Sequence, residues 1–170
     1  MKTTGLPALL TGLCRGLSRW SLRGAALGLV GLVLCVQWQV VGRYLLNNTP
    51  TWTEPVALLL VLYITALAVA VGVRDAGHLG LESLIQLLPA RVQPGFMALI
   101  HLLVALFGVL MTTSGWQWMA LKWNEPKPML GIPDGLDYLP MVVGGALIVL
   151  FCIEHLIALW RGQTIEPAGI

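Results

Sequence analysis

Long uncharged stretches alternate with short charged ones along this sequence. Asp, Glu, Lys and Arg are missing from residues 24–42, 55–73, 92–121 and 138–153. An α-helix of about 20 residues crosses a hydrocarbon core of roughly 30 Å, so each of the first three stretches is long enough to span a bilayer. The fourth reaches that length only if the helix continues through Glu154 and His155 toward Trp160. The pattern predicts an all-α integral membrane protein with four transmembrane helices.

Local signals indicate where these helices begin and pack. Pro55 suits the first turn of the second helix, and Pro94-Gly95 precedes the third. Gly24 and Gly28 form a small-xxx-small pair, which favours close packing of the first helix against a neighbour. We expect spans at about 24–43, 55–73, 95–118 and 139–160, all within a single membrane domain that covers residues 1–170.

An amphipathic segment lies between the second and third spans. Within residues 79–89, Leu81, Leu84, Ile85 and Leu88 fall on one helical face. The segment is too short to cross a bilayer. It therefore predicts a helix that lies along the cytoplasmic membrane surface and ends at Pro89.

A second amphipathic pattern precedes the first span. Apolar residues recur there at steps of three and four: Leu6, Leu9, Leu10, Leu13, Leu17 and Trp20. This spacing favours an interfacial helix. The alternative is a poorly ordered tail, because several glycines weaken a helix in this region. No small-x-small cleavage site follows the apolar run, so we expect the segment to be retained rather than removed as a signal peptide.

Composition narrows the function. The chain has 170 residues, of which 57% are apolar and 11% charged, so it leaves no room for a soluble catalytic domain and is not expected to be an enzyme. A net charge of +2 gives no sign of a nucleic-acid partner. Cys14, Cys35 and Cys152 have no CxxC spacing, and we expect neither a disulfide framework nor a bound metal.

The basic residues are distributed unevenly over the two faces of a four-span protein. One face carries both termini and seven of the ten cations: Lys2, Arg15, Arg19, Arg23, Arg74, Arg91 and Arg161. The opposite face carries Arg43, Lys122 and Lys127. Because cytoplasmic loops are enriched in Lys and Arg, this bias predicts that both termini are cytoplasmic.

Two charged pairs flank the second span. Arg43 and Glu54 are separated by only ten residues at the outer end of the first hairpin, so they either form an ion pair or stay separate at headgroup level. Arg74 and His78 lie four residues apart at the inner end. Taken alone, the second pair indicates an interfacial basic cluster.

Glu154 is a carboxylate within a predicted span. Because ionisable groups are costly inside a membrane, such a residue indicates a functional site. It lies about 9 Å inside Trp160 by helix rise, and His101 reaches a similar depth in the third span. Two interpretations follow: a Glu154–His101 polar contact, or His101 and His155 as axial ligands of a haem. A structural histidine is the commoner outcome, and we expect no cofactor.

An autonomous transporter is disfavoured by the same pattern. The first span carries no carboxylate, the charge bias selects one orientation, and no span is broken as expected around a midplane substrate site. Three classes remain: an accessory membrane subunit, a haem-bearing membrane anchor of a redox complex, and a self-contained small transporter.

Several motifs together resemble one family, the small membrane subunit of tripartite ATP-independent periplasmic (TRAP) transporters, known as DctQ-like proteins. Arg43-Tyr44, followed by Trp52-x-Glu54, is similar to the family pattern around the first hairpin. The segment 74–80, with Arg74-x-x-x-His78, resembles the family's entry into an amphipathic helix.

The resemblance continues into the fourth span. Leu130-Gly131-Ile132-Pro133, then Tyr138, Pro140 and Gly144, and finally Phe151-x-x-Glu154 resemble the last outer loop and helix of the family. Altogether it covers about residues 40–155 in the right order. One departure is Pro55, which stands where the family usually has a second carboxylate after Glu54.

The resemblance implies a role and its partners. It implies a heterodimer with a large multi-span subunit that carries the substrate and sodium sites and moves like an elevator. A periplasmic binding protein delivers an organic acid to that pair, which lies in the bacterial inner membrane. The small subunit enlarges the stationary part and helps dock the binding protein, with structural or interface roles for Arg43, Tyr44, Trp52, Glu54, Arg74, His78 and Glu154. It binds no substrate itself.

The orientation can be tested directly. Single cysteines introduced near residue 165 and in the loop 123–140 of a Cys-free variant should react differently with an impermeant thiol reagent on intact cells. We expect labelling of the loop and none of the C-terminal site, because of the charge bias. Labelling near residue 165 from outside would contradict the predicted topology.

Overall fold

The computed structural model describes residues 6–75, 89 and 92–161. Within them the chain forms four α-helices and one short 3₁₀-helix: α1 (Leu6–Tyr44), α2 (Thr53–Asp75), α4 (Gln93–Leu121), η1 (Asp134–Asp137) and α5 (Leu139–Trp160). Each of the four α-helices has a stretch long and apolar enough to cross a membrane. The all-α class with four spans is therefore confirmed. The predicted surface helix at 79–89 lies outside the described residues, apart from Pro89.

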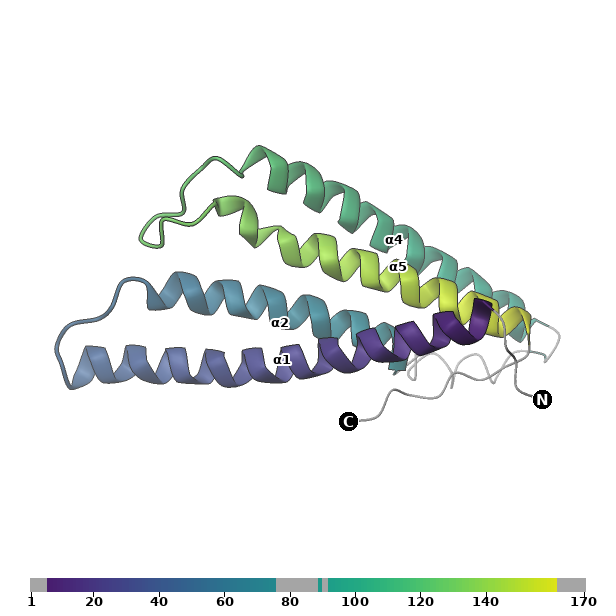
Figure 1. The fold of residues 1–170 in the computed structure, drawn as a ribbon, viewed down its shortest axis with the longest axis horizontal. Coiled ribbons are helices and arrows are strands. Elements are labelled where there is room, and N and C mark those ends of the chain that lie inside the picture. Colours follow the sequence, from purple (N-terminus) through teal and green to yellow (C-terminus); the bar gives the residue numbers. More distant parts are fainter. Residues whose placement is uncertain (1–5, 76–88, 90–91, 162–170) are drawn as a thin grey trace.

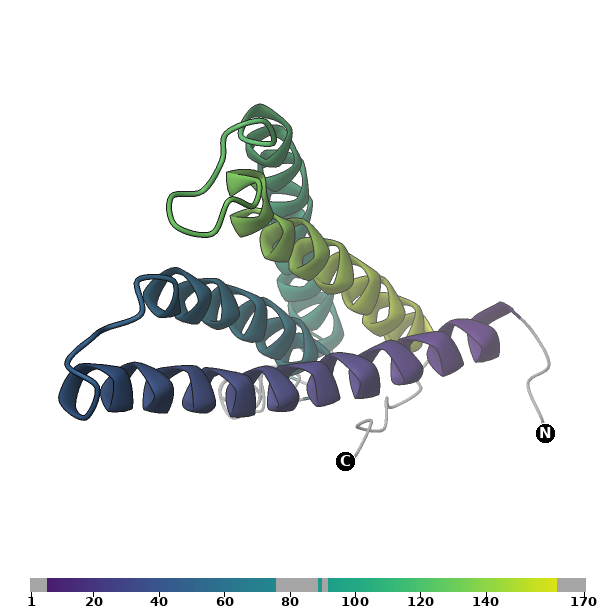
Figure 2. The same ribbon diagram turned by 60° about the vertical axis from the view of Figure 1, so that its left-hand side comes forward.

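The four α-helices form two hairpins, α1 with α2 and α4 with α5, and α5 also packs against α2. Figures 1 and 2 show that the hairpins diverge toward their two connecting loops and converge at the opposite end. At that convergent end, the N-terminal part of α1 passes α2 and reaches α5. The described part of the chain therefore has the shape of a wedge. Its closed end is the one opposite the two connecting loops.

Glycines allow the closest helix contacts. A Cβ added at Gly145 of α5 would lie 2.7 Å from the carbonyl oxygen of Gly108 in α4, so the two backbones approach without room for a side chain. Gly144, on the neighbouring position, faces Ala66 of α2 in the same way. Gly28 faces Ile64 of α2, which confirms the packing role predicted for the small residues of the first span. Small residues thus bring α5 against both of its neighbours.

α1 is longer than a single span requires. Its 39 residues form one continuous helix of about 58 Å, compared with about 35 Å for the 23 residues of α2. The segment predicted as an interfacial helix is thus helical from Leu6, and it is continuous with the first span because α1 contains no proline after Pro7. Its location at the membrane surface stays a prediction.

The loop between α4 and α5 is irregular, and it is held by hydrogen bonds of its own backbone. The amide nitrogens of Lys127 and Asp134 donate hydrogen bonds to the carbonyls of Ile132 and Glu125, at 2.8 Å each. Lys127 also forms an ion pair with Asp137 of η1. Tyr63 of α2 donates a hydrogen bond to the carbonyl oxygen of Leu136 at 3.2 Å, which connects this loop to the other hairpin.

The close approach of α4 and α5 generates a stability prediction. Gly145→Ala should destabilise the protein by about 1–3 kcal/mol, because the new methyl group overpacks against Gly108 and Thr112. Gly72→Ala in α2 is the matched control, since its Cβ meets no atom within 4 Å. Thermal unfolding in detergent should give a lower Tm for the first variant only, and equal Tm values would contradict the packing.

Candidate functional site: a buried charge cluster where the helices converge

Arg74, in the last turn of α2, lies at the centre of the convergent end. Its side chain is fully buried, and its Nε and Nη2 atoms donate to the two carboxylate oxygens of Glu154 in α5 at 3.0 and 3.2 Å. This is a bidentate charge-assisted pair, the strongest common form of such an interaction. The guanidinium also lies 5.9 Å from the ring centroid of Phe151, one turn before Glu154. The pair joins the first hairpin to the second.

Asp75 extends the cluster to α1. Its Oδ1 accepts a hydrogen bond from Arg74 Nη1 at 2.7 Å, and its Oδ2 accepts one from the Ser18 hydroxyl at 3.1 Å. Ser18 is fully buried on the face of α1 that meets α2. Polar contacts therefore run from α1 through α2 to α5.

Two histidines bring α4 into the same region. His155 Nε2, next to Glu154 in α5, lies 3.0 Å from the carbonyl oxygen of Arg74. The ring of His155 stacks on that of His101 in α4, with centroids 4.6 Å apart and planes 11° apart. Residues from all four α-helices thus meet at one end of the wedge.

Burial makes this cluster energetically sensitive. Removing one partner of a buried ion pair leaves a charge that the surroundings cannot solvate, which costs about 3–5 kcal/mol. When the two charges pair with each other, the free-energy cost of burying them is far smaller. The helices must therefore stay in register for the pair to persist. The arrangement acts as a positional constraint between the two hairpins.

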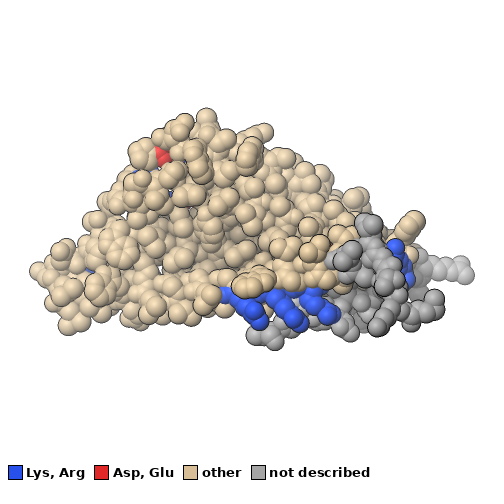
Figure 3. All heavy atoms as spheres, in the orientation of Figure 1, with Lys and Arg blue, Asp and Glu red and all other residues tan. Residues whose placement is uncertain are grey.

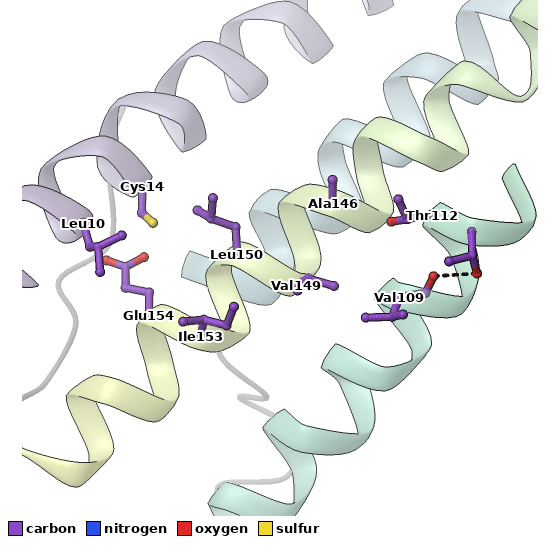
Figure 4. A pocket seen from close by; sticks show the side chains of 10 residues that line it. Leu10, Cys14, Val109, Thr112, Ala146, Val149, Leu150, Ile153 and Glu154 are labelled. Atoms are coloured by element: carbon purple, nitrogen blue, oxygen red, sulfur yellow. Dashed lines mark hydrogen bonds between the residues drawn. The ribbon is translucent and has the colours of Figure 1, made fainter. Parts of the chain in front are cut away.

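Next to the cluster lies an apolar pocket of about 450 Å³ between α1, α4 and α5. Figure 4 shows Leu10 and Cys14 of α1 on one side, and Cys14 points toward the Glu154 carboxylate. Thr112 lies at the far end, on α4. Among the described residues of the lining, Glu154 is the only charged one, and Arg74 already binds its carboxylate. In the described part of the chain, no group of three or more His, Cys, Asp or Glu could hold a metal ion.

The structure changes the interpretation of Arg74. The sequence suggested a basic interfacial cluster of Arg74 with His78, but Arg74 is a buried partner of Glu154. That prediction was wrong for Arg74 because charge spacing along one helix carries no information about an acid on another helix. His78 lies outside the described residues.

The expectations for Glu154 and the histidines need the same correction. Glu154 is buried, as its depth predicted, but its hydrogen-bond partner is Arg74, which neither sequence alternative included. The two rings also do not fit a haem, because axial imidazoles each direct a ring nitrogen at the iron from opposite sides of the porphyrin, whereas these rings stack face to face with centroids 4.6 Å apart. Cys14, Cys35 and Cys152 are buried free thiols.

The candidates on the first hairpin lie at the opposite, open end. Arg43 and Glu54 are both exposed, and neither forms an ion pair with another described residue. Tyr44 is 78% exposed and Trp52 is also exposed. The structure therefore brings Arg74 and Glu154 together, and leaves this second group on the surface.

Sequence reasoning missed Asp75 and Ser18. Asp75 directly follows Arg74 at the end of the second span. An acid next to a base at that position could have indicated a charge cluster. The signal for Ser18 was weaker. Ser18 and Ser21 belong to a stripe of buried small residues on α1, and this stripe can be recognised only once α1 is packed against α2.

Comparison with known proteins decides the family. A family model described as "Tripartite ATP-independent periplasmic transporters, DctQ component" matches residues 32–162, which include Arg74, Asp75 and Glu154. The chain belongs to the DctQ family. It is 25% identical to a TRAP transporter small permease protein of Haemophilus influenzae over 129 residues, or 74% of this chain and 80% of that protein.

A second DctQ relative is the sialic acid TRAP transporter small permease protein SiaQ of Vibrio cholerae. It is 22% identical over 133 residues, or 78% of this chain and 77% of the relative. DctQ proteins are transporter permease subunits rather than enzymes, and they work with a large membrane subunit and a binding protein. This DctQ chain is therefore a small permease subunit and a multi-pass inner membrane protein.

The charge cluster generates the next prediction. Glu154→Leu should lower stability by about 3–5 kcal/mol, because it leaves Arg74 buried without its main partner. The double variant Arg74→Met with Glu154→Leu should recover much of this loss, since no buried charge is stranded. Thermal unfolding in detergent measures both.

The matched control is the exposed pair Lys122–Glu125. Glu125→Leu should cost no more than about 1 kcal/mol, because a surface pair contributes little. If Glu154→Leu proved as mild as Glu125→Leu, the cluster would not constrain the helices.

Proposed function

We propose that this chain is the stationary small subunit of a sodium-driven TRAP transporter for organic acids. In this proposal it forms a heterodimer with a large subunit that carries the substrate and sodium sites and moves like an elevator. The observation that carries the proposal is the DctQ match over residues 32–162, which begins in the C-terminal part of α1 and includes the other three spans. The sialic acid named for the Vibrio cholerae relative is consistent with an organic acid as the substrate class.

The pockets support a subunit that holds no substrate itself. A second pocket, of about 630 Å³ between α2, α4 and α5, has Asp137 as its charged lining residue, and Asp137 is paired with Lys127. In the first pocket Glu154 is paired with Arg74. An organic acid is an anion, and neither described pocket is lined by a Lys or Arg that could bind it.

The rigid end of the wedge suits a stationary role. A transport domain that moves across the membrane needs a counterpart whose depth and internal geometry do not change. The buried cluster holds the two hairpins together at one end, and we place this end in the cytoplasmic half of the bilayer, with both termini cytoplasmic. The whole chain then acts as one membrane domain.

The open end of the wedge supports the docking part of the proposal. Arg43, Tyr44, Trp52 and Glu54 are exposed on the first hairpin, and the ordered α4–α5 loop lies at the end of the second. We place these surfaces on the periplasmic side, where they are available to the large subunit and the binding protein. His78 is the remaining interface candidate on the cytoplasmic side.

Uptake by cells that lack this chain provides the test. Deleting it should abolish sodium-dependent organic acid uptake, whereas the binding protein should keep its affinity for the substrate in solution. The large subunit should also co-purify with the full-length chain in mild detergent. Full uptake by the large subunit alone would contradict the proposal.

A further inference from the structure

The pocket between α2, α4 and α5 extends along α5. Its lining runs from Asp137, just before the first turn of α5, to Ile148, eleven residues later. That separation corresponds to about 16 Å at the helical rise of 1.5 Å per residue. Each leaflet contributes about 15 Å to a hydrocarbon core of roughly 30 Å, so the pocket has the length of one leaflet.

The end of the pocket at Asp137 lies at the membrane surface. Residues 138–153 contain no charge, so Asp137 stands directly before the apolar part of the fourth span. Next to it, the ring of Tyr138 stacks on that of Trp118 in α4, with centroids 6.1 Å apart. Such aromatic side chains concentrate at headgroup level. The other end of the pocket, at Ile148, is near the middle of α5 and therefore of the bilayer.

Between its two ends the pocket is apolar. Among the described residues of its lining, Asp137 is the only charged one, and α2 and α4 contribute side chains such as Leu62, Val69, Phe107 and Met111. An apolar cavity stays dry and binds apolar molecules. The apolar molecule that surrounds a membrane protein is a lipid, and its acyl chain ends near the midplane, as the pocket does. A helix of another subunit would instead continue across the bilayer.

The surface end of the pocket, which we call the mouth, consists of Asp137 with its neighbours Lys127 and Asp134. Lys127 forms an ion pair with Asp137 and lies 4.0 Å from Asp134, so one cation faces two acids. Oδ1 of Asp137 has no hydrogen-bond partner among the described residues. On the face that Figure 3 shows, acidic surface lies over the α4–α5 loop, whereas the largest basic surface lies over the N-terminal half of α1. The net negative mouth repels an anionic headgroup and attracts a cationic one.

We propose that this pocket binds an acyl chain of a phospholipid with an ammonium headgroup, such as phosphatidylethanolamine. The chain lies along α5 as far as Ile148, and the ammonium group pairs with the acids of the mouth. The bound chain contacts both hairpins, because α2 lines the pocket together with α4 and α5. The inference does not rest on the proposed transport function.

Photocrosslinking in vesicles provides the test. The full-length chain, with any subunit that co-purifies, is reconstituted in equimolar phosphatidylethanolamine and phosphatidylglycerol. A trace of one of the two lipids carries a photoreactive group in its acyl chain, and labelled residues are identified by mass spectrometry. We expect the phosphatidylethanolamine probe to label Met111 about fivefold more than the phosphatidylglycerol probe, as one unit of charge near a membrane surface provides. Leu110, an exposed neighbour outside the described lining, should show no preference.

Filling the pocket should displace the acyl chain. Thr65→Phe places a large ring in the lining and should lower the labelling of Met111 by about fivefold or more, because overpacking opposes binding. Ala146→Phe is the matched control, since Ala146 is also a small exposed residue but lines the other pocket, between α1, α4 and α5. The control should leave the labelling of Met111 unchanged.

Neutralising the mouth should remove the headgroup preference and keep the chain. In Asp137→Asn the two probes should label Met111 to within about twofold of each other, because the net charge of the mouth is gone. Glu125→Gln is the matched control. It removes the same charge from the same loop, but Glu125 is paired with Lys122 and does not line the pocket. The control should keep the preference.

Equal labelling of Met111 by the two probes in the wild type would overturn the proposal. So would an unlabelled Met111, because another subunit would then cover the pocket, and so would a Thr65→Phe variant that keeps its helix content and is labelled as the wild type is. If a variant does not fold, the wild-type comparison of Met111 with Leu110 still decides. Uptake plays no part in this measurement, so its failure is distinguishable from failure of the transport role.

Discussion

Arg74 and Glu154 are 80 residues apart in the sequence, and a membrane interior disfavours each of them strongly without the other. The two helices that carry them must therefore stay at matching depths, and a slide of one helical turn, about 5.4 Å, would break both hydrogen bonds. Asp75 and Ser18 apply the same condition to α1. The stacked pair His101 and His155 extends it to α4.

Small residues and the charge cluster act at different places along the wedge. Gly144 and Gly145 let α5 approach Ala66 and Gly108 in the middle of the membrane, where dispersion contacts and short backbone distances provide the attraction. The ion pair then selects the register at the convergent end. Toward the connecting loops the hairpins diverge, and the Tyr63–Leu136 hydrogen bond is a polar link between them there.

This division suits the stationary role that we propose for this subunit. The convergent end contains an internal ion pair and its hydrogen-bonded partners, so the shape of the chain at this end depends on electrostatics between buried groups. The open end presents exposed side chains, among them Tyr44 and Trp52, that are not needed to hold the helices together. Surfaces of this kind can be adapted to a partner without loss of the fold.

The sequence by itself determined the four spans. The thickness of the hydrocarbon core sets a minimum length for each apolar stretch, and that length can be counted directly in the sequence. It also indicated that Glu154 is buried and that the chain resembles the DctQ proteins. The depth of a residue within a span and the order of motifs can both be obtained by counting along the sequence. The partner of Glu154 was decided only by the tertiary structure. Whether Arg74, His101 or His155 meets that carboxylate depends on how the helices are placed side by side and rotated about their axes, and apolar lengths contain no information about either.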